Sequence, residues 1–227
     1  MNIVAIIPAR KGSKSIKNKN IINYKGKPLI YHSIKTALKS KLINTVVVST
    51  DSKKYQSMVI KFGASAPFLR PNKYSNDNSS DRDFIIHASK FLISKNNYPD
   101  LIVLLRPTTP NRDIKIVNKG IKLFIKNFKK YDSMRSVSKF NQPPQKLFMI
   151  KNKTLKGFFD KVLKGEYHSR PRQKYTKTYL PNGYIDILKP SFFLNNKNKL
   201  WGKIQPFLTN ETLDIDIQSD LKAKSKV

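Results

Sequence analysis

Short apolar runs alternate along the chain with longer stretches in which apolar residues recur at helical spacing. The runs rich in Ile, Val and Leu are Ile3–Ile7, Thr45–Ser49 and Leu101–Leu105. Each ends in a polar or proline-bearing loop, and such runs are typical of strands buried on both faces of a parallel sheet. Helical spacing is found over Leu29–Ser40, Tyr55–Phe62, Phe84–Ser94 and Ile114–Asn127. The order of these elements predicts an α/β fold, in which helices cover a mainly parallel sheet.

The pattern changes after residue 138, at the end of a further predicted strand over Met134–Ser138. Residues 139–178 carry scattered Pro, Gly and basic residues and indicate irregular or short-stranded structure. Because about forty residues is long for a plain connection, we expect this segment to be a functional or interface element. We therefore divide the chain into a core, residues 1–138 and 179–227, and an insert, residues 139–178.

The sheet pattern resumes towards the C-terminal end. Tyr184–Leu188 predicts a strand, with residues 180–184 as the turn that opens it. Leu213–Ile217 alternates strictly, which predicts a last strand with Asp214 and Asp216 on one face. Their backbones would lie roughly 6.6 Å apart, so both carboxylates could bind one hard cation. A solvated edge strand explains the same alternation, and both interpretations stay open from this feature alone.

Composition fits one sizeable domain of 227 residues, since 39% of them are hydrophobic and can fill a packed core. No run approaches the roughly 18 apolar residues of a membrane span. Pro8 and Arg10 interrupt the first apolar stretch too early for a signal peptide. The chain has no cysteine, so it has neither disulfides nor thiolate metal ligands. These features predict a cytoplasmic protein with no membrane partner.

The formal net charge of +31 would ordinarily suggest a nucleic-acid partner. Only eight of the 45 basic residues are arginine, however, and the lysines are spread over all regions of the chain. Nucleic-acid-binding proteins usually concentrate charge on one face and use arginine for bidentate contacts. We therefore interpret most lysines as solvated surface and expect no nucleic acid as partner. A non-catalytic, basic nucleic-acid-binding protein remains the alternative from another class.

The first apolar run passes at Pro8 into a small, polar and strongly basic loop over residues 9–20. Open α/β sheets bind their ligands at the carboxyl ends of their strands, which is where this loop lies. Its cations are Arg10, Lys11, Lys14, Lys17 and Lys19, and Gly12 with Ser13 lets backbone N–H groups approach a ligand closely. The loop lacks the Walker spacing and the paired glycines of a dinucleotide turn. It predicts an anion site, with a nucleoside triphosphate as the anion it fits best. Basic loops after strands are common and this chain is basic throughout, so an ordinary surface loop is the alternative interpretation from this feature alone.

Two further arginines stand at places where such sheets bind ligands. Arg106 follows the run Leu101–Leu105 at the tip of a predicted strand. Its guanidinium suits a planar carboxylate or phosphate, and a structural ion pair at the sheet edge is the alternative interpretation. Arg70 precedes a polar loop that contains a helix N-cap ahead of Phe84. Capping alone could account for the Ser and Asp residues of that loop.

Taken in order, these motifs resemble one known family. IIPARKGSKSIKNKN, the RP…SNDNSSD segment, LLRPTTPNR, LPNGYIDIL and DIDIQSDL follow one another as in acylneuraminate cytidylyltransferases, the CMP-sialic acid synthetases. The resemblance covers essentially the whole chain. It implies a Rossmann-like nucleotidyltransferase fold with a small dimerisation insert. It also implies transfer of CMP from CTP to an acidic nine-carbon (nonulosonic) sugar, with Mg²⁺ and release of pyrophosphate.

The resemblance also implies roles for individual residues. Arg10 and Lys19 would hold the triphosphate, and Ala9 and Asn20 would help to place the nucleotide. Those expected to face cytosine and ribose are Arg70, Asn78 and Ser80. The residues expected to bind Mg²⁺ are Asp214 and Asp216. The expected catalytic residues are these two aspartates together with Arg10 and Lys19. The residues expected to contact the sugar are Arg106 and Asn182. Lys146 and Arg172 are expected there as well, because they lie in a segment that, in family members, reaches the active site of the partner subunit in a homodimer.

Several positions depart from the family pattern. Lys11 and Ser15 stand where glycine is usual, and Arg106 stands where sialic acid enzymes commonly carry glutamine. Exchanging a neutral amide for a guanidinium changes both charge and donor count near the sugar. We therefore expect a legionaminic- or pseudaminic-type sugar rather than ordinary N-acetylneuraminate. An eight-carbon sugar such as KDO ranks lower, because those enzymes usually carry an acidic motif where residues 104–110 stand here.

Overall fold

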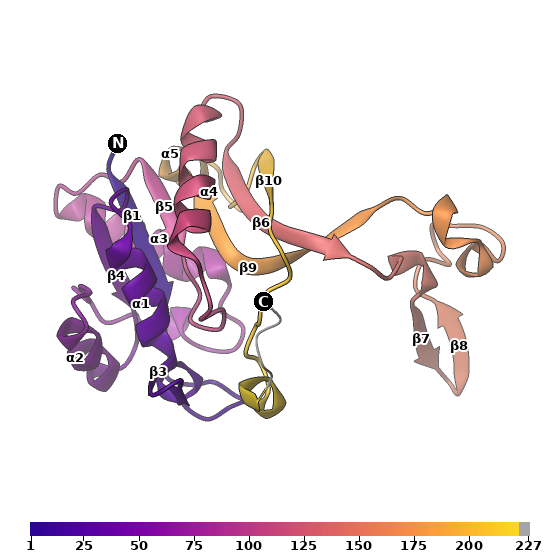
Figure 1. Ribbon diagram of the computed structural model, residues 1–227, viewed down its shortest axis with the longest axis horizontal. Helices are drawn as coiled ribbons and strands as arrows, with labels where there is room; N and C mark the ends of the chain where they lie inside the picture. Colours follow the sequence, from indigo (N-terminus) through magenta and orange to yellow (C-terminus); the bar gives the residue numbers. More distant parts are fainter. Residues whose placement is uncertain (223–227) are drawn as a thin grey trace.

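The computed structural model describes residues 1–222 and builds them around one six-stranded sheet (Figure 1). Its strands, in the order β10-β6-β9-β5-β1-β4, are Ile204–Leu208, Ser133–Phe140, Thr178–Leu188, Leu101–Leu104, Ile3–Pro8 and Thr45–Ser49. β1 pairs in parallel with β4 and β5, and β10 pairs in parallel with β6. β9 runs antiparallel between β5 and β6. The predicted α/β fold with a mainly parallel sheet is confirmed.

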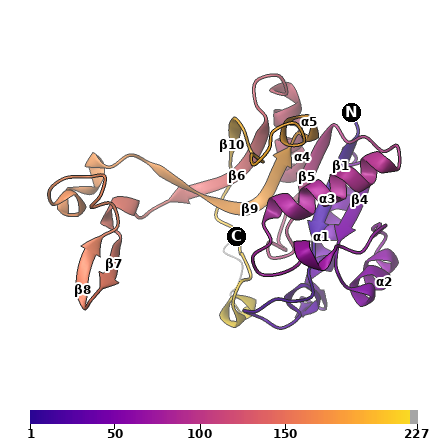
Figure 2. The same ribbon diagram turned by 180° about the vertical axis from the view of Figure 1, so that it is seen from behind.

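Helices cover both faces of this sheet, and all four predicted helices are present. They are α1 Leu29–Lys39, α2 Lys53–Lys61, α3 Asp81–Ser94 and α4 Ile114–Lys126, joined by the short α5 Pro190–Phe193. Successive side chains of β1 point to opposite faces, so Ala5 and Ile7 pack towards α1 and α4, whereas Val4 and Ile6 pack towards α3. Figure 2 shows α3 on the face opposite α1. The central strands are therefore buried on both sides.

One strand of the sheet was not anticipated from the sequence. β10 is the edge strand beside β6, and only alternate residues of it are buried. It contains Pro206, which cannot donate a ladder hydrogen bond and is therefore confined to edges of sheets. The proline and the short length hid this strand among the irregular segments that surround it.

The predicted strand over Leu213–Ile217 is wrong. In the described chain this segment joins no sheet, and its backbone link to another part of the fold is from the Ile215 amide to the Thr108 carbonyl at 2.8 Å. Ile215 is fully buried against Ile16 and Leu29 in a small apolar cluster. The alternation therefore reflects one buried side chain, Ile215, between the polar residues Asp214 and Asp216, and not one face of a sheet.

The predicted turn at residues 180–184 is also wrong, because these residues lie inside β9. Gly183 has a φ of +66°, and the register between β6 and β9 shifts between Arg135 and Val137. A Cβ at Gly183 would come within 2.9 Å of the Thr109 hydroxyl. The Asn-Gly pair marks an irregularity within a long strand, not the start of a hairpin.

Beyond the sheet, β6 and β9 continue as a two-stranded ribbon, with Phe140 opposite Thr178. The chain between them, residues 141–177, forms an arm that projects far from the core (Figure 1). The arm carries a hairpin of β7 Phe148–Lys151 and β8 Thr154–Gly157. A second small hairpin, β2 Asn23–Tyr24 with β3 Lys27–Pro28, precedes α1. Short 3-10 turns complete the structure at Lys19–Ile21, Asn72–Tyr74, Pro144–Lys146, Tyr167–Ser169, Arg172–Lys174 and Gln218–Lys222.

None of the helices in residues 1–222 combines the length and the apolar character needed to cross a membrane.

Candidate active site

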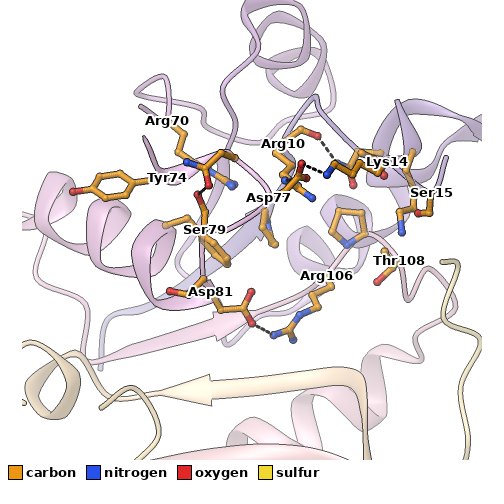
Figure 3. Close-up of a pocket in the computed structure, with 18 residues that line it drawn as sticks. Arg10, Lys14, Ser15, Arg70, Tyr74, Asp77, Ser79, Asp81, Arg106 and Thr108 are labelled. Carbon is orange, nitrogen blue, oxygen red and sulfur yellow. Dashed lines mark hydrogen bonds and ion pairs between the residues drawn. The ribbon is translucent and has the colours of Figure 1, made fainter. Parts of the chain in front are cut away.

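A cavity of about 460 Å³ opens at the carboxyl ends of β1 and β5, where Pro8 and Arg106 leave the sheet (Figure 3). Its size lies within the range of small-molecule sites, and its place is where open α/β sheets bind ligands. The first turn of α3 closes one side through Ser80 and Asp81. Of the predicted site residues, those that line this cavity are Arg10, Lys19, Asn20, Arg70, Ser80 and Arg106.

The loop after β1 is held at both ends by hydrogen bonds from the surrounding chain. The Ala9 amide donates to the Ser49 carbonyl at 2.9 Å, and the Lys11 amide donates to the Asp51 carboxylate at 2.8 Å. The Asn20 side-chain amide donates to the Arg10 carbonyl at 2.9 Å. Ala9 and Asn20 are both buried. Their roles here are to fix the loop whose cations enter the cavity.

Two cations of that loop converge on one carboxylate. Arg10 and Lys14 lie 2.9 and 2.8 Å from the two oxygens of Asp77. Hydrogen bonds from Lys14 and then from Arg10 hold the pKa of Asp77 below its usual range. The loop therefore binds the Asp77 carboxylate with two cationic side chains, and a phosphate group would need the same arrangement.

Lys19 enters the cavity from the turn Lys19–Ile21 and binds Asp216 at 2.8 Å. The preceding Asn18 adopts the left-handed conformation that asparagine tolerates better than most residues. The Lys19 side chain is only 12% exposed, whereas that of Asp216 is 66% exposed. The contact joins residues 197 positions apart, and so brings the C-terminal segment to the first loop.

Asp214 and Asp216 lie on the segment that crosses beside Thr108. Partial loss of hydration raises the pKa of Asp214, the hydroxyl of Thr108 opposes this shift, and the charge of Asp216 adds to it. The backbone amides of Asp216 and Ile217 donate to Asp220 at 2.8 and 2.9 Å, which fixes the segment. Two nearby carboxylates whose charges disfavour each other form a fitting oxygen set for a hard cation.

Arg70 is buried and lines the cavity. Its Nε donates to the Ser49 hydroxyl at 3.0 Å, a second nitrogen donates to the Ser49 carbonyl, and the guanidinium stacks 4.8 Å from the Phe84 ring. Burial lowers the pKa of Arg70 to about 10. Ser80 serves as the N-cap of α3 in a capping box with Asp83. Capping thus accounts for Ser80, although it also lines the cavity.

Arg106 stands between two carboxylates rather than free in the cavity. Its guanidinium nitrogens lie 2.5 Å from Asp81 at the start of α3 and 2.5 Å from Asp186 in β9. Burial works to lower the pKa of Arg106, and the two carboxylates more than offset it, so that the pKa is raised. The alternative interpretation of Arg106 as an ion-paired residue at the sheet edge therefore describes the observed geometry.

Seven predicted residues do not line this cavity. Ala9 fixes the first loop, and Asp214 and Asp216 lie beside the cavity, as described above. Of the other four, Asn78 is exposed. Asn182 is buried beside the C-terminal segment, where its side-chain amide donates to the Thr209 hydroxyl at 2.7 Å. Lys146 and Arg172 both lie in the arm, where Lys146 stacks on Tyr175 and Arg172 donates to a carbonyl within the arm. A site containing these two cations would need a second copy of the chain.

Sequence reasoning missed the residues that hold the site together. Asp77 and Asp81 belong to the polar loop before Phe84, whose acidic residues capping alone could explain, and the sequence indicates no partner for Asp186. Arg112 is a buried guanidinium that donates to the carbonyls of Arg106, Thr109, Gly183 and Tyr184, and burial lowers its pKa to about 9. Local patterns could not reveal these roles, because Asp77, Asp81 and Asp186 are paired with residues of other elements and Arg112 also bonds to β9.

Comparison with known proteins places this architecture in a family. Residues 4–171 match the family described as cytidylyltransferase. The chain is 35% identical over 98% of its length to the pseudaminic acid cytidylyltransferase of Campylobacter jejuni strain 81-176, covering 94% of that protein. It is 32% identical to the CMP-N,N'-diacetyllegionaminic acid synthase of Legionella pneumophila, covering 96% of it. It is also 32% identical to the N-acylneuraminate cytidylyltransferase of Escherichia coli O18:K1:H7, but spans only 50% of that longer protein.

Solved structures share the fold at low sequence identity. A CMP:2-keto-3-deoxy-manno-octonic acid synthetase complexed with CTP superposes with a TM-score of 0.70 at 17% identity, over 98% of this chain and 96% of the other. The 4-diphosphocytidyl-2C-methyl-D-erythritol synthase of Anaerococcus prevotii gives a TM-score of 0.63 at 12% identity, over 97% and 95%. These likenesses concern the fold alone. Together with the family match and the more similar relatives above, they show that the chain belongs to the cytidylyltransferase family.

Proposed function

We propose that this protein transfers CMP from CTP to a nonulosonic acid of the sialic, legionaminic or pseudaminic type and releases pyrophosphate. The observation that carries the proposal is that Arg10, Lys14 and Lys19 line one cavity. Two carboxylates stand beside it, because Asp216 binds Lys19 and Asp214 contacts the hydroxyl of the cavity residue Thr108. Relatives named for all three sugar types support the substrate class. The proposed function implies the cytoplasm as its location, because its substrate CTP is found there.

This reaction needs the protein to position the two substrates and to stabilise charge on the phosphates, and it needs no covalent intermediate with the protein. The anomeric hydroxyl oxygen of the sugar forms a bond to the α-phosphorus as the bond from that phosphorus to the bridging oxygen breaks. The hydroxyl proton passes to water, and pyrophosphate leaves with the bond electrons. Arg10 and Lys19 lie where they would stabilise the negative charge on the phosphates during this exchange.

Asp214 and Asp216 would hold the Mg²⁺ that the proposed reaction uses. When bound, that ion would neutralise charge on the triphosphate. Within residues 1–222 no group of three or more potential metal-binding side chains gathers, so nucleotide oxygens and water would complete the coordination. Lys19, whose ammonium contacts Asp216 at 2.8 Å, would bind the phosphates next to this pair of carboxylates.

The arm is part of the proposal, because its surface is unusually apolar for a segment that extends into solvent. Ile150, Leu155 and Val162 are 79%, 63% and 77% exposed. We propose that a second copy of the chain covers these side chains in a homodimer, which would also carry Lys146 and Arg172 towards the partner's cavity. Sedimentation should then show a dimer for the intact protein, and a monomer for the double variant Ile150→Asp, Val162→Asp.

Pyrophosphate release tests the catalytic proposal. The purified protein is incubated with CTP, Mg²⁺ and, in separate reactions, N-acetylneuraminate, legionaminic-type and pseudaminic-type sugars and KDO. We expect turnover with a nine-carbon sugar, and faster turnover with a legionaminic- or pseudaminic-type sugar than with N-acetylneuraminate. Preference for KDO would reassign the substrate to the eight-carbon class. Tight, salt-sensitive DNA or RNA binding without any turnover would favour the nucleic-acid-binding alternative instead.

A further inference from the structure

Asp186 holds the Arg106 side chain in place at the end of the cavity formed by β5 and the start of α3. This carboxylate is 1% exposed and sits in β9 directly opposite Leu104 of β5. Its second oxygen lies 3.5 Å from Arg135, whose guanidinium stacks 4.1 Å from the Trp201 ring. If the Arg106 side chain turned into the cavity, the buried carboxylate of Asp186 would lose an ion-pair partner, which costs free energy.

The charges at this end sum to zero across Arg106, Arg135, Asp81 and Asp186. Arg106 is held on two carboxylates and thus offers little net attraction to the carboxylate of an acid sugar. The exposed member of the group is Asp81, whose side chain is 44% exposed, whereas that of Arg106 is 21% exposed. The group at this end that remains open to a ligand is consequently an acceptor and not a cation.

Of the two carboxylate oxygens of Asp81, one accepts a hydrogen bond within the described residues. Oδ2 accepts from Arg106, and within residues 1–222 no hydrogen bond to Oδ1 is formed. Figure 3 shows the Asp81 carboxylate beside Arg106 on the wall of the cavity. An ionised carboxylate oxygen only accepts hydrogen bonds, so its complement is a hydroxyl or an amide N–H.

We propose that Asp81 is a specificity-determining residue that accepts a hydrogen bond from a hydroxyl or acylamino N–H of the sugar, with Arg106 and Asp186 as positioning residues. The inference rests on the proposed function, because it assigns the recognition of the sugar within the same cavity. Because the charges at this end cancel, this end offers no net attraction to the sugar's own carboxylate, and its contact to the sugar is a hydrogen bond.

Asp81→Asn tests this with almost no change of shape. Arg106 has only donors, so the amide oxygen must face Arg106 and the NH₂ group must face the cavity. The substitution thus replaces an acceptor by a donor at the position that contacts the sugar. We expect the KM for the sugar to rise roughly 10- to 100-fold, the range that follows from losing a hydrogen bond to a charged group. The KM for CTP should stay within about twofold of the wild-type value.

Asp83→Asn is the matched control, because it removes the same charge from the same helical turn. Asp83 accepts from the Ser80 amide at 2.8 Å and does not line the cavity. It should leave the KM for the sugar unchanged. If Asp81→Asn lowers the unfolding temperature markedly, Asp81→Ser is measured in its place and should show the same rise in the sugar KM alone.

The outcomes separate this inference from the function on which it rests. Absence of turnover by the wild-type protein with every acid sugar would refute the proposed function itself. An active wild type whose sugar KM is unchanged in Asp81→Asn, or whose CTP KM rises equally, would refute the role of Asp81 alone. Comparing N-acetylneuraminate with its analogue carrying a hydroxyl in place of the acetamido group identifies the donor. A rise confined to the acetamido sugar assigns the N–H, and an equal rise assigns a hydroxyl.

Discussion

The two ends of the cavity use the same chemistry, paired cations and carboxylates, for different purposes. At the loop end, Arg10 and Lys14 meet Asp77 with all three side chains at least 34% exposed. At the other end, Arg106 meets Asp186, which is 1% exposed and lies within the sheet. Exposed ion pairs stabilise a fold very little and can exchange partners, whereas a buried pair is strongly destabilised when one partner is removed.

This difference indicates which contacts a ligand can replace. A triphosphate could take Arg10 and Lys14 from Asp77, because all three side chains are open to water. It could also take Lys19 from Asp216, because that carboxylate is 66% exposed and needs no other partner. It cannot take Arg106 from Asp186 without exposing a buried charge. The loop end is therefore suited to binding, and the Arg106 end is suited to shaping the cavity. Four predictions test this contrast.

The largest effect should follow Asp216→Asn. This variant removes a carboxylate proposed to bind Mg²⁺ and also the partner of Lys19. We expect kcat/KM for pyrophosphate release to fall about 10³-fold, since charge stabilisation is the main contribution to this class of reaction. Glu211→Gln, which neutralises an exposed acid a few residues earlier, is the control and should retain wild-type activity. Equal activity in both variants would remove Asp216 from the site.

The next largest effect should follow Asp186→Asn, and it concerns stability. Loss of a buried partner of Arg106 should lower the free energy of unfolding by about 3 kcal/mol, measured in urea. Asp77→Asn should leave the unfolding midpoint close to that of the wild type, because its ion pairs are exposed. If the two variants are equally stable, the distinction between fixed and exchangeable pairs fails.

A smaller effect is expected from pH. Because the pKa of Asp214 is raised, this carboxyl takes up a proton at a higher pH than an ordinary aspartate. A protonated carboxyl is a poor Mg²⁺ ligand, so the apparent Mg²⁺ affinity should fall as the pH is lowered, starting above the usual Asp pKa of about 3.9. Titration of activity against Mg²⁺ at several pH values measures this. An affinity that stays constant down to the usual pKa would contradict it.

The smallest effect should follow Asp77→Asn on CTP binding. Asp77 now occupies the cations proposed to hold the triphosphate, so its neutralisation should lower the KM for CTP, by roughly two- to fivefold. Steady-state kinetics with saturating sugar measures the change, and Glu211→Gln again serves as the control. A raised KM would mean that Asp77 organises the loop for CTP rather than competing with it.

Much of the fold could be predicted because hydrophobic periodicity reports burial locally. The runs that became β1, β4 and β5 and the four long helices each carry their own pattern, so their place did not depend on distant residues. The same logic failed at Leu213–Ile217, where one buried side chain, Ile215, imitated a strand. It failed again at β10, where Pro206 broke the pattern of a genuine edge strand.

By itself the sequence determined the α/β class, the basic loop after the first strand and the family resemblance, because these depend on residues that are neighbours in the chain. Only the tertiary structure decided which charges meet. Lys19 and Asp216 are 197 positions apart, and Arg106 lies 80 positions from Asp186 and 25 from Asp81. The pair Arg106–Asp186 arises from the strand order, which brings β9 beside β5, and the other two arise from the packing of α3 and of the C-terminal segment at the same end of the sheet. Their energies depend on burial, a property that belongs to the folded chain and not to any short segment of it.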